Sequence, residues 1–268
     1  MGTSYDIVFI LVFLGAIYTE CSPSLADSMM CPSAVLCSCS DIELSANCSS
    51  RGFSTVPPGL PEELKILDMS RNHLRRINST ELFRLSSLEY LDLSRNRLTE
   101  LTMSRSGQNV HLNLRKLDLS HNRISSVKSL WLTGLERLQD LNLANNQIES
   151  LPSRTLFEIG SSLRHLNLKS NRIVSLEPEC FNDLYVLKEL TLTKNKLSSF
   201  PKEVDLQSLE VLELNKNSFV QIEGLMFNGL PKLRVSYHQI LNDIDQLTTI
   251  GRFLIKFTLF LFNYRNFV

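Results

Sequence analysis

The sequence has no net charge, and it contains few of the residues that mark low-complexity chains. Its 268 residues include 28 Lys and Arg, 28 Asp and Glu, ten Gly and nine Pro. Without an excess of positive charge, no long-range field attracts nucleic acid. The low Gly and Pro content excludes a collagen-like or low-complexity chain. We therefore expect a globular protein that has no nucleic-acid partner.

Motifs that bring catalytic or metal-binding groups together are also absent from the sequence. There is no HExxH, HxH, GxSxG or CxxC, and no glycine-rich loop for phosphate. The five histidines occupy unrelated positions, so no nucleophile with a predictable base can be assigned. We expect no enzymatic activity, no metal site, no cofactor and no small-molecule substrate.

No apolar run is long enough to span a bilayer as a helix, which needs about 20 residues. The run at residues 7–17 has 11 residues, the length of a signal-peptide core. Cleavage is expected after Ala26, with Cys21 as the alternative. The first six residues contain Asp6 and no Lys or Arg, which counts against this interpretation. We expect residues 1–26 to be a signal peptide and the protein to be extracellular and secreted; membrane attachment would require a longer chain.

Four cysteines are crowded directly after the expected export signal. Cys31, Cys37, Cys39 and Cys48 are typical of a disulfide framework in a secreted protein. They lack the CxxC pairs of zinc sites. Four cysteines allow three pairings, and their spacing does not choose among them. Cys180 stands apart, and we favour a packing role for it over an intermolecular disulfide.

What the sequence has in abundance is one repeated motif. The pattern L-x-x-L-x-L-x-x-N-x-L begins at residues 64, 88, 114, 138, 163, 187 and 209. Its last two leucines alternate with exposed positions, which is the period of a half-buried strand. No single coil can bury its own leucines, so stability requires stacked neighbours. The motif predicts an α/β fold, a leucine-rich-repeat solenoid with a curved parallel sheet on its concave face.

Each repeat carries an asparagine where the chain leaves the expected strand. Turned inward, its amide can bond backbone groups of adjacent coils that would otherwise be buried without partners. We therefore interpret these asparagines as structural residues, which we call the asparagine frame, and not as part of a binding or catalytic site. The seven asparagines are Asn72, Asn96, Asn122, Asn146, Asn171, Asn195 and Asn217.

The motif divides the chain into parts. Residues 27–63 are expected to form a cysteine-rich cap and residues 64–235 the repeats, seven complete and an eighth that breaks off. Residues 236–268 form an atypical tail. Lys256 interrupts its apolar run and its ending is polar, which disfavours a membrane anchor or a lipid-anchor signal. We favour truncation of the repeats, followed by sequence foreign to them.

The exposed strand positions form three columns along the concave face. The first column precedes the second leucine of each motif, the second column follows it, and the third column lies two residues further on. These positions mix charges and hold few aromatic residues, which suits a protein ligand. Tyr90 is the best anchor candidate because aromatic residues dominate interface energies; an ordinary solvent-facing residue is the alternative. The binding candidates are Tyr90, Asp92, Lys116, Asp118, Asp140, His165, Lys169, Glu189 and Glu213.

Aspartates recur in the second column at Asp68, Asp92 and Asp118. A pair of carboxylates is the machinery of glycoside hydrolysis. The segment LDLS is a common form of the repeat motif, however, so the motif explains why these aspartates recur without any catalytic role. We expect their side chains to face solvent.

Two glycosylation sequons occur, Asn47-Cys48-Ser49 and Asn78-Ser79-Thr80. The second lies on a return arm, the segment that connects one strand to the next, and should be accessible. The first encloses a cap cysteine, which argues against its use.

Four segments are more specific than the generic repeat. They are SSRGFSTVPPGLP after Cys48, SRSGQNVH at 104–111, FEIGSSLRHLNL at 157–168 and QIEGLMFNGL at 221–230. On these residues, and over 31–235 as a whole, the chain resembles the leucine-rich-repeat-and-immunoglobulin-like-domain family of membrane glycoproteins. The resemblance implies cap disulfides Cys31–Cys39 and Cys37–Cys48. It also implies modulation of growth-factor receptor signalling, with a receptor tyrosine kinase ectodomain as the protein partner.

Two other classes of leucine-rich-repeat protein remain as alternatives. A matrix-binding protein of the small proteoglycan type would bind collagen, although its N-terminal cysteines are more tightly spaced. An innate-immune pattern-recognition protein would use the same face for microbial ligands.

Overall fold

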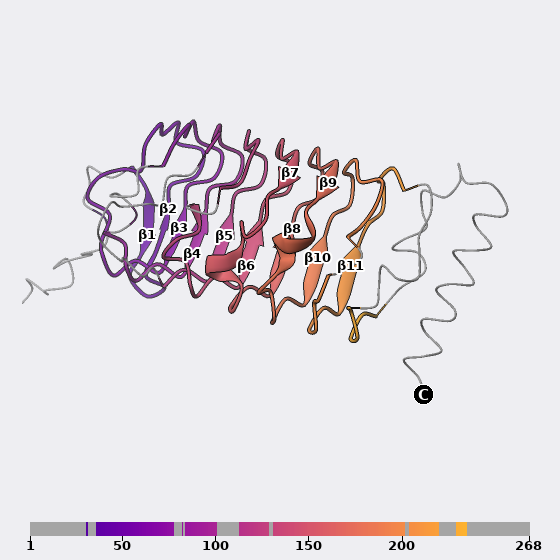
Figure 1. The fold of residues 1–268 in the computed structure, drawn as a ribbon. Coiled ribbons are helices and arrows are strands. Elements are labelled where there is room, and N and C mark those ends of the chain that lie inside the picture. The colour runs from indigo at the N-terminus through magenta and orange to yellow at the C-terminus, as the bar shows by residue number, and fades with distance from the viewer. Residues whose placement is uncertain are drawn as a thin grey trace, which may run out of the picture.

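The computed structural model describes residues 31, 36–77, 82, 84–100, 113–128, 131–201, 204–219 and 229–234. In these residues the chain winds into a solenoid whose strands stack side by side (Figure 1). The expected signal peptide, the sequon asparagine Asn78 and the tail at 236–268 lie outside the described residues.

Nine strands form one sheet in the order β1-β2-β3-β4-β5-β6-β8-β10-β11. β1 (Ser38–Ser40) and β2 (Ser45–Asn47) form an antiparallel hairpin, and all further neighbours are parallel. Each repeat strand covers the same three motif positions, so the predicted parallel solenoid is confirmed. The repeat strands are β3 (Ile66–Asp68), β4 (Tyr90–Asp92), β5 (Lys116–Asp118), β6 (Asp140–Asn142), β8 (His165–Asn167), β10 (Glu189–Thr191) and β11 (Val211–Glu213).

Each repeat strand buries its central leucine between the two neighbouring coils. Leu91 on β4 is in register with Leu67 on β3 and Leu117 on β5, and all three are buried. Complete burial of one leucine side chain contributes about 1.5–3 kcal/mol. The contacts come from the adjacent coils, so the core runs continuously along the solenoid and no repeat is stable alone.

The asparagines form the predicted frame. Asn96 Nδ2 donates hydrogen bonds to the carbonyl of Met69 in the preceding repeat (2.9 Å) and to that of Leu93 in its own repeat (3.1 Å). Its Oδ1 accepts a hydrogen bond from the backbone N–H of Leu74 (3.1 Å). The same three bonds recur at each of the other six asparagines.

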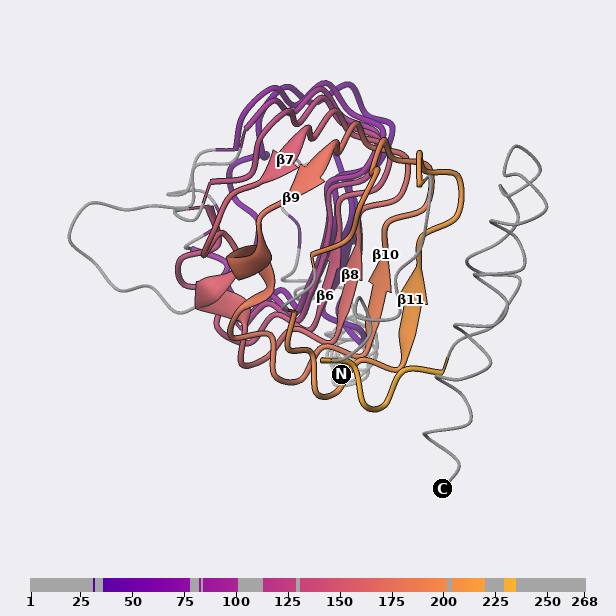
Figure 2. The ribbon, with the colours of Figure 1, turned by 45° about the vertical axis from the view of Figure 1, so that its right-hand side comes forward.

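The return arms carry little regular structure. β7 (Ser150–Leu151) and β9 (Ser175–Leu176) pair in parallel as a second sheet on the return side (Figure 2). Two short 3-10 helices, η2 (Phe157–Ile159) and η3 (Pro178–Phe181), follow these strands. The α/β fold is thus mostly strands and extended arms with few helices.

Aromatic residues fill the core from the return side. The rings of Phe181 and Phe200 stack with centroids 6.0 Å apart. Cys180 is a free, buried thiol, in agreement with its expected packing role. Burial raises the pKa of Cys180 to about 12, and the charge of Glu177 adds to this shift.

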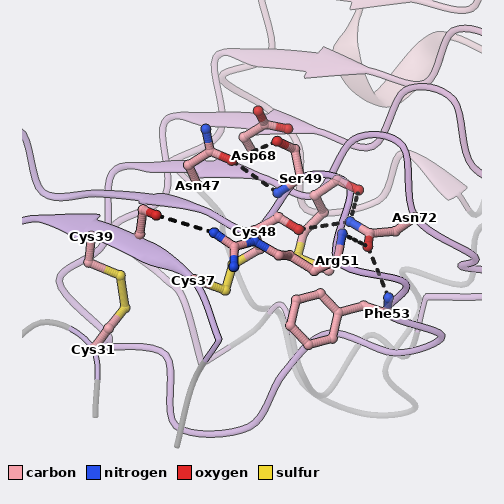
Figure 3. Close-up of a disulfide and its surroundings, with 12 residues drawn as sticks. Cys31, Cys37, Cys39, Asn47, Cys48, Ser49, Arg51, Phe53, Asp68 and Asn72 are labelled. Carbon is pink, nitrogen blue, oxygen red and sulfur yellow. Dashed lines mark hydrogen bonds between the residues drawn. A yellow bond between two sulfur atoms is a disulfide. The ribbon is translucent and has the colours of Figure 1, made fainter. Parts of the chain in front are cut away.

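Two disulfides hold the cap together (Figure 3). The pairs are Cys31–Cys39 and Cys37–Cys48, as the family resemblance implies. Cys48 is completely buried, and its backbone N–H donates to the carbonyl of Asp68 (2.8 Å). Its own carbonyl accepts a hydrogen bond from Asn72 Nδ2 (2.9 Å). The cap therefore joins the first repeat through the same asparagine frame that joins the repeats to each other.

Candidate binding surface

The register of the strands brings the predicted columns together on the exposed side of the main sheet, which is the concave face. Tyr90 is the register partner of Ile66 and Lys116, and Asp92 is the partner of residues 68 and 118. Neighbouring strands lie about 4.8 Å apart, so each column is a continuous row of neighbours. All the binding candidates except Lys169 lie within repeat strands.

Tyr90 stands among three carboxylates at the N-terminal part of this face. Burial raises the pKa of the Tyr90 phenol, and the charges of Asp92, Asp118 and Asp68 raise it further, in that order. Burial also raises the pKa of Asp92, although hydrogen bonds from Ser94 oppose the shift. The arrangement presents an aromatic ring beside three carboxylates.

The second column also has a local role that sequence reasoning missed. Asp92 is half-buried, and its Oδ1 accepts a hydrogen bond from the backbone N–H of Ser94 (2.8 Å). The side chain thereby stabilises the turn that follows the strand. The repeated spacing of Asp and Ser was the available sequence signal. Within the repeats, four other pairs form this bond: Asp68 with Ser70, Asp118 with Ser120, Asn142 with Ala144, and Asn167 with Lys169.

Asp140 connects two other candidates at the centre of the face. Its Oδ2 lies 3.5 Å from Nζ of Lys116, and its Oδ1 is hydrogen-bonded to Nδ1 of His165. The side chains of Lys116 and His165 remain 63% and 42% exposed, so both can reach a partner. Exposed ion pairs contribute at most about 1 kcal/mol to folding. The main effect of Asp140 is therefore to orient its two neighbours.

The remaining candidates are spread towards the C-terminal end of the face. Glu189 is exposed on β10, and Lys169 is exposed beyond the end of β8. Glu213 Oε2 accepts a hydrogen bond from Thr193 Oγ1 (3.4 Å). Five strand spacings separate Glu213 from Tyr90, about 24 Å. These residues extend the surface and do not join the cluster around Tyr90.

A charged row beside the first column was not among the candidates. Glu89 Oε2 lies 3.6 Å from Nε of Arg115, and Glu89 Oε1 lies 4.0 Å from Nζ of Lys65. The apolar residue Ile66, next to Tyr90 on the face, is also 37% exposed. The second position of the motif carries these charges, and its periodicity was the signal that could have found them.

Among the described residues, no group of three or more His, Cys, Asp or Glu side chains is arranged to hold a metal ion. In the same part of the chain, no helix has the length and apolar character needed to cross a membrane.

Comparison with known sequences identifies the same repeats. The leucine rich repeat family matches residues 49–100, 113–161 and 161–204. Oligodendrocyte-myelin glycoprotein of Mus musculus is 28% identical over 148 residues, which cover 48% of this chain and 33% of that protein. Toll-like receptor 2 type-1 of Gallus gallus is 28% identical over 141 residues, covering 53% of this chain and 17% of the receptor.

A third relative carries a name close to the family that the sequence resembles. Leucine-rich repeat and immunoglobulin-like domain-containing nogo receptor-interacting protein 1-B of Danio rerio is 41% identical over 63 residues, covering 24% of this chain and 10% of that protein. This chain spans a third or less of the length of these three relatives. The matches show the repeats and do not extend to immunoglobulin-like domains.

Solved structures share the fold. In the crystal structure of a TLR13–ssRNA13 complex, one chain matches with a TM-score of 0.57 and 29% identity, covering 64% of this chain and 25% of that one. A chain of the octameric complex of Latrophilin 3, Unc5D and FLRT2 matches with a TM-score of 0.51 and 23% identity, covering 76% of this chain and 75% of that one. The second likeness shows the fold alone.

Proposed function

The chain belongs to the leucine-rich repeat family, and we propose that it is an extracellular recognition module that binds a protein ligand along its concave face. The observation that carries the proposal is the open row of charged side chains around Tyr90 on a sheet of stacked strands. A protein interface covers about 800 Å² on each partner, so it needs an extended and open face. A small molecule instead needs an enclosed pocket.

Tyr90 is the proposed energetic centre of the interface. Its ring is held half-buried on β4, so little side-chain entropy is lost when a partner covers it. The carboxylates of Asp92 and Asp118 would attract a cationic group of the partner. Lys116 and His165, oriented by Asp140, would require a complementary negative or polar group nearby.

The cap supports an extracellular location. Disulfides such as Cys37–Cys48 persist in oxidising compartments and are rare in the cytosol. Two of the relatives are named as a glycoprotein and a receptor, which is consistent with recognition outside the cell.

The finer proposal concerns the partner. The resemblance to leucine-rich-repeat-and-immunoglobulin-like-domain proteins supports binding to the ectodomain of a growth-factor receptor tyrosine kinase, and modulation of its signalling. No catalytic step is needed, because occupation of the receptor surface would alter its association with ligands or with other receptors.

The proposal is tested with the full chain, secreted from cultured cells and immobilised on a biosensor. The analytes are growth-factor receptor ectodomains, fibrillar collagen, microbial glycans and single-stranded RNA. Saturable capture of a receptor ectodomain supports the proposal. Exclusive binding of collagen or of microbial glycans would favour the matrix or innate-immune alternative, and exclusive binding of RNA would refute a protein ligand.

A matched pair of tyrosine variants tests the face. Tyr90→Ala should weaken capture at least tenfold, about 1.4 kcal/mol, as expected for an interface anchor. Tyr185→Ala is the control, because Tyr185 lies in the return arm after η3 and is 60% exposed. Equal affinity of both variants would place the interface elsewhere.

A further inference from the structure

The sequon asparagine Asn47 lies on the concave face. It is the last residue of β2, and its register partner on β3 is Asp68. Ala46 before it is buried, whereas Asn47 is exposed, so its side chain points to the same side as the second column. Asn47 therefore continues the second column into the cap.

The two polar atoms of the Asn47 side chain are in different situations. Oδ1 accepts hydrogen bonds from the backbone N–H of Ser49 (3.0 Å) and from Ser49 Oγ (2.7 Å). Nδ2 makes no hydrogen bond to any residue that the structure describes, and no dashed line reaches it in Figure 3. Nδ2 is the atom to which an N-linked sugar is attached.

Other asparagines of the chain use this atom. Nδ2 of Asn142, in the same column, donates to Asp118 Oδ2 (2.9 Å). Nδ2 of the frame residue Asn72 is enclosed by three backbone carbonyls. At Asn47 the amide nitrogen instead faces outward beside Ser49, the third residue of a sequon.

We propose that Asn47 carries an N-linked glycan that covers the N-terminal part of the concave face and thereby controls access to Tyr90. The inference rests on the proposed extracellular function, because the sugar donor, an oligosaccharide on a lipid pyrophosphate, belongs to the export pathway. Asn47 Nδ2 bonds to the anomeric carbon of the sugar and loses one proton. The bond from that carbon to the pyrophosphate oxygen breaks, and the lipid pyrophosphate leaves with the electron pair.

Cys48 within the sequon is compatible with this modification if the sugar is added before the cap closes. In the folded chain Cys48 is buried, bonded to Cys37 and held by the carbonyl of Asp68. These contacts hold the sequon backbone in place, but they leave Asn47 Nδ2 outside. A sugar attached to the unfolded chain therefore remains accommodated after the Cys37–Cys48 disulfide forms.

The position of Asn47 determines what the glycan would cover. β4 lies two strands from β2, about 10 Å away, and it carries Tyr90 and Asp92. A glycan of several sugars is bulky and exceeds that distance. Lys116 and His165 are progressively further away along the same face. The glycan would thus shield the acidic, aromatic end before it reaches the central network.

The first experiment measures the modification itself. The full chain with Asn78→Gln is secreted from cultured mammalian cells, so that Asn47-Cys48-Ser49 is the one remaining sequon. The mass of the peptide that contains residue 47 should increase by a glycan. Ser49→Ala, which keeps the asparagine but removes the sequon, should abolish the increase. An unmodified Asn47 in the secreted protein would refute the proposal without any bearing on ligand binding.

The second experiment measures coverage by hydroxyl-radical footprinting. The glycosylated chain is compared with the same chain after an endoglycosidase has left one N-acetylglucosamine. Trimming should raise the oxidation rate of Tyr90 at least twofold, whereas the rate of Tyr185 on the return arm should not change. An unchanged rate at Tyr90 would show that the glycan does not cover the face. The Ser49→Ala chain, which never carries the glycan, should match the trimmed chain.

Discussion

Asn122 donates a hydrogen bond from Nδ2 to the backbone carbonyl of Leu93, a residue 29 positions earlier, at 3.0 Å. The same nitrogen donates to the carbonyl of Leu119 (3.0 Å), and Oδ1 accepts from the backbone N–H of Leu98 (2.9 Å). One buried side chain thus satisfies backbone groups of two neighbouring coils. The amide therefore contributes to the single register in which the repeats stack.

Asn122→Asp should therefore destabilise the protein by about 2–4 kcal/mol, because a carboxylate cannot donate and would face backbone carbonyls in a buried position. Denaturant unfolding of the purified variant measures the loss. Asn182→Asp makes the same chemical change at an exposed residue of a return arm and should cost less than about 0.5 kcal/mol. Equal losses at both positions would contradict the frame interpretation.

Asp92→Asn should stabilise the protein at neutral pH, by up to about 1 kcal/mol because the site is only half-buried. Burial raises the pKa of Asp92, so ionisation of its carboxyl group is less favourable in the folded than in the unfolded protein. Its contribution to stability is greatest below the unfolded pKa and is lost as pH rises through the folded pKa. Asparagine keeps Oδ1 for the backbone of Ser94 and carries no charge.

The gain from Asp92→Asn should shrink as pH falls and the wild-type carboxyl group becomes protonated. Thermal unfolding of both proteins between pH 3 and pH 7 gives the difference. Glu149→Gln removes one negative charge from an exposed residue and serves as the control. A stabilisation that persists unchanged at the acid end would argue against a charge effect.

Gly160→Ala should cost about 1–3 kcal/mol through a steric clash. A Cβ atom at Gly160 would lie 2.5 Å from the backbone oxygen of Asp183 in the next repeat, which cannot move independently of its coil. The φ angle of Gly160 is −60°, which any residue adopts, so close approach alone requires glycine there.

Gly52→Ala is the instructive comparison for Gly160→Ala. No atom lies within 4 Å of a Cβ at Gly52, but its φ is +76°, which alanine disfavours by about 1–2 kcal/mol. Gly52→Asn should recover part of that loss, since asparagine tolerates the left-handed region. Gly160→Asn should instead lower the free energy of unfolding more than Gly160→Ala does, because its side chain is larger. Chemical denaturation of the four variants measures these differences.

Replacement of Cys37 and Cys48 by serine should destabilise the cap by about 3 kcal/mol or more. The disulfide no longer constrains the loop, and a polar hydroxyl group is placed at a buried position. Cys48 is fully buried, whereas Cys31 and Cys39 are only partly buried. The Cys31→Ser and Cys39→Ser pair should therefore cost less. Hydrogen exchange of the Cys48 amide, which is bonded to the carbonyl of Asp68, reports on the cap directly.

The thiol of Cys180 should resist alkylation in the folded protein. Burial raises its pKa to about 12, so almost no thiolate exists at pH 8, and the side chain is not accessible. Mass spectrometry after maleimide treatment should find Cys180 unmodified without denaturant and labelled in it. Rapid labelling of the native chain would mean that the return arm after β9 opens.

The periodicity of the sequence was sufficient to predict the repeat strands and the asparagine frame. Residues such as Leu91 and Asn96 recur at one spacing, and each has one physical role that its chemistry alone identifies. The cap disulfides were different, because four cysteines allow three pairings and only the family resemblance selected the pair Cys37–Cys48. Pattern reasoning identifies what every coil shares, and it is weak where one coil departs from its neighbours.

The sequence by itself determined the solenoid, because regularly spaced leucines can be buried only by stacking coils against each other. The tertiary structure decided which side chains meet across coils. It placed Asp140 between Lys116 and His165, and it brought the backbone of Asp183 against Gly160. These contacts depend on distances between residues about 25 positions apart, which no local pattern encodes; the register of the stacked strands sets them.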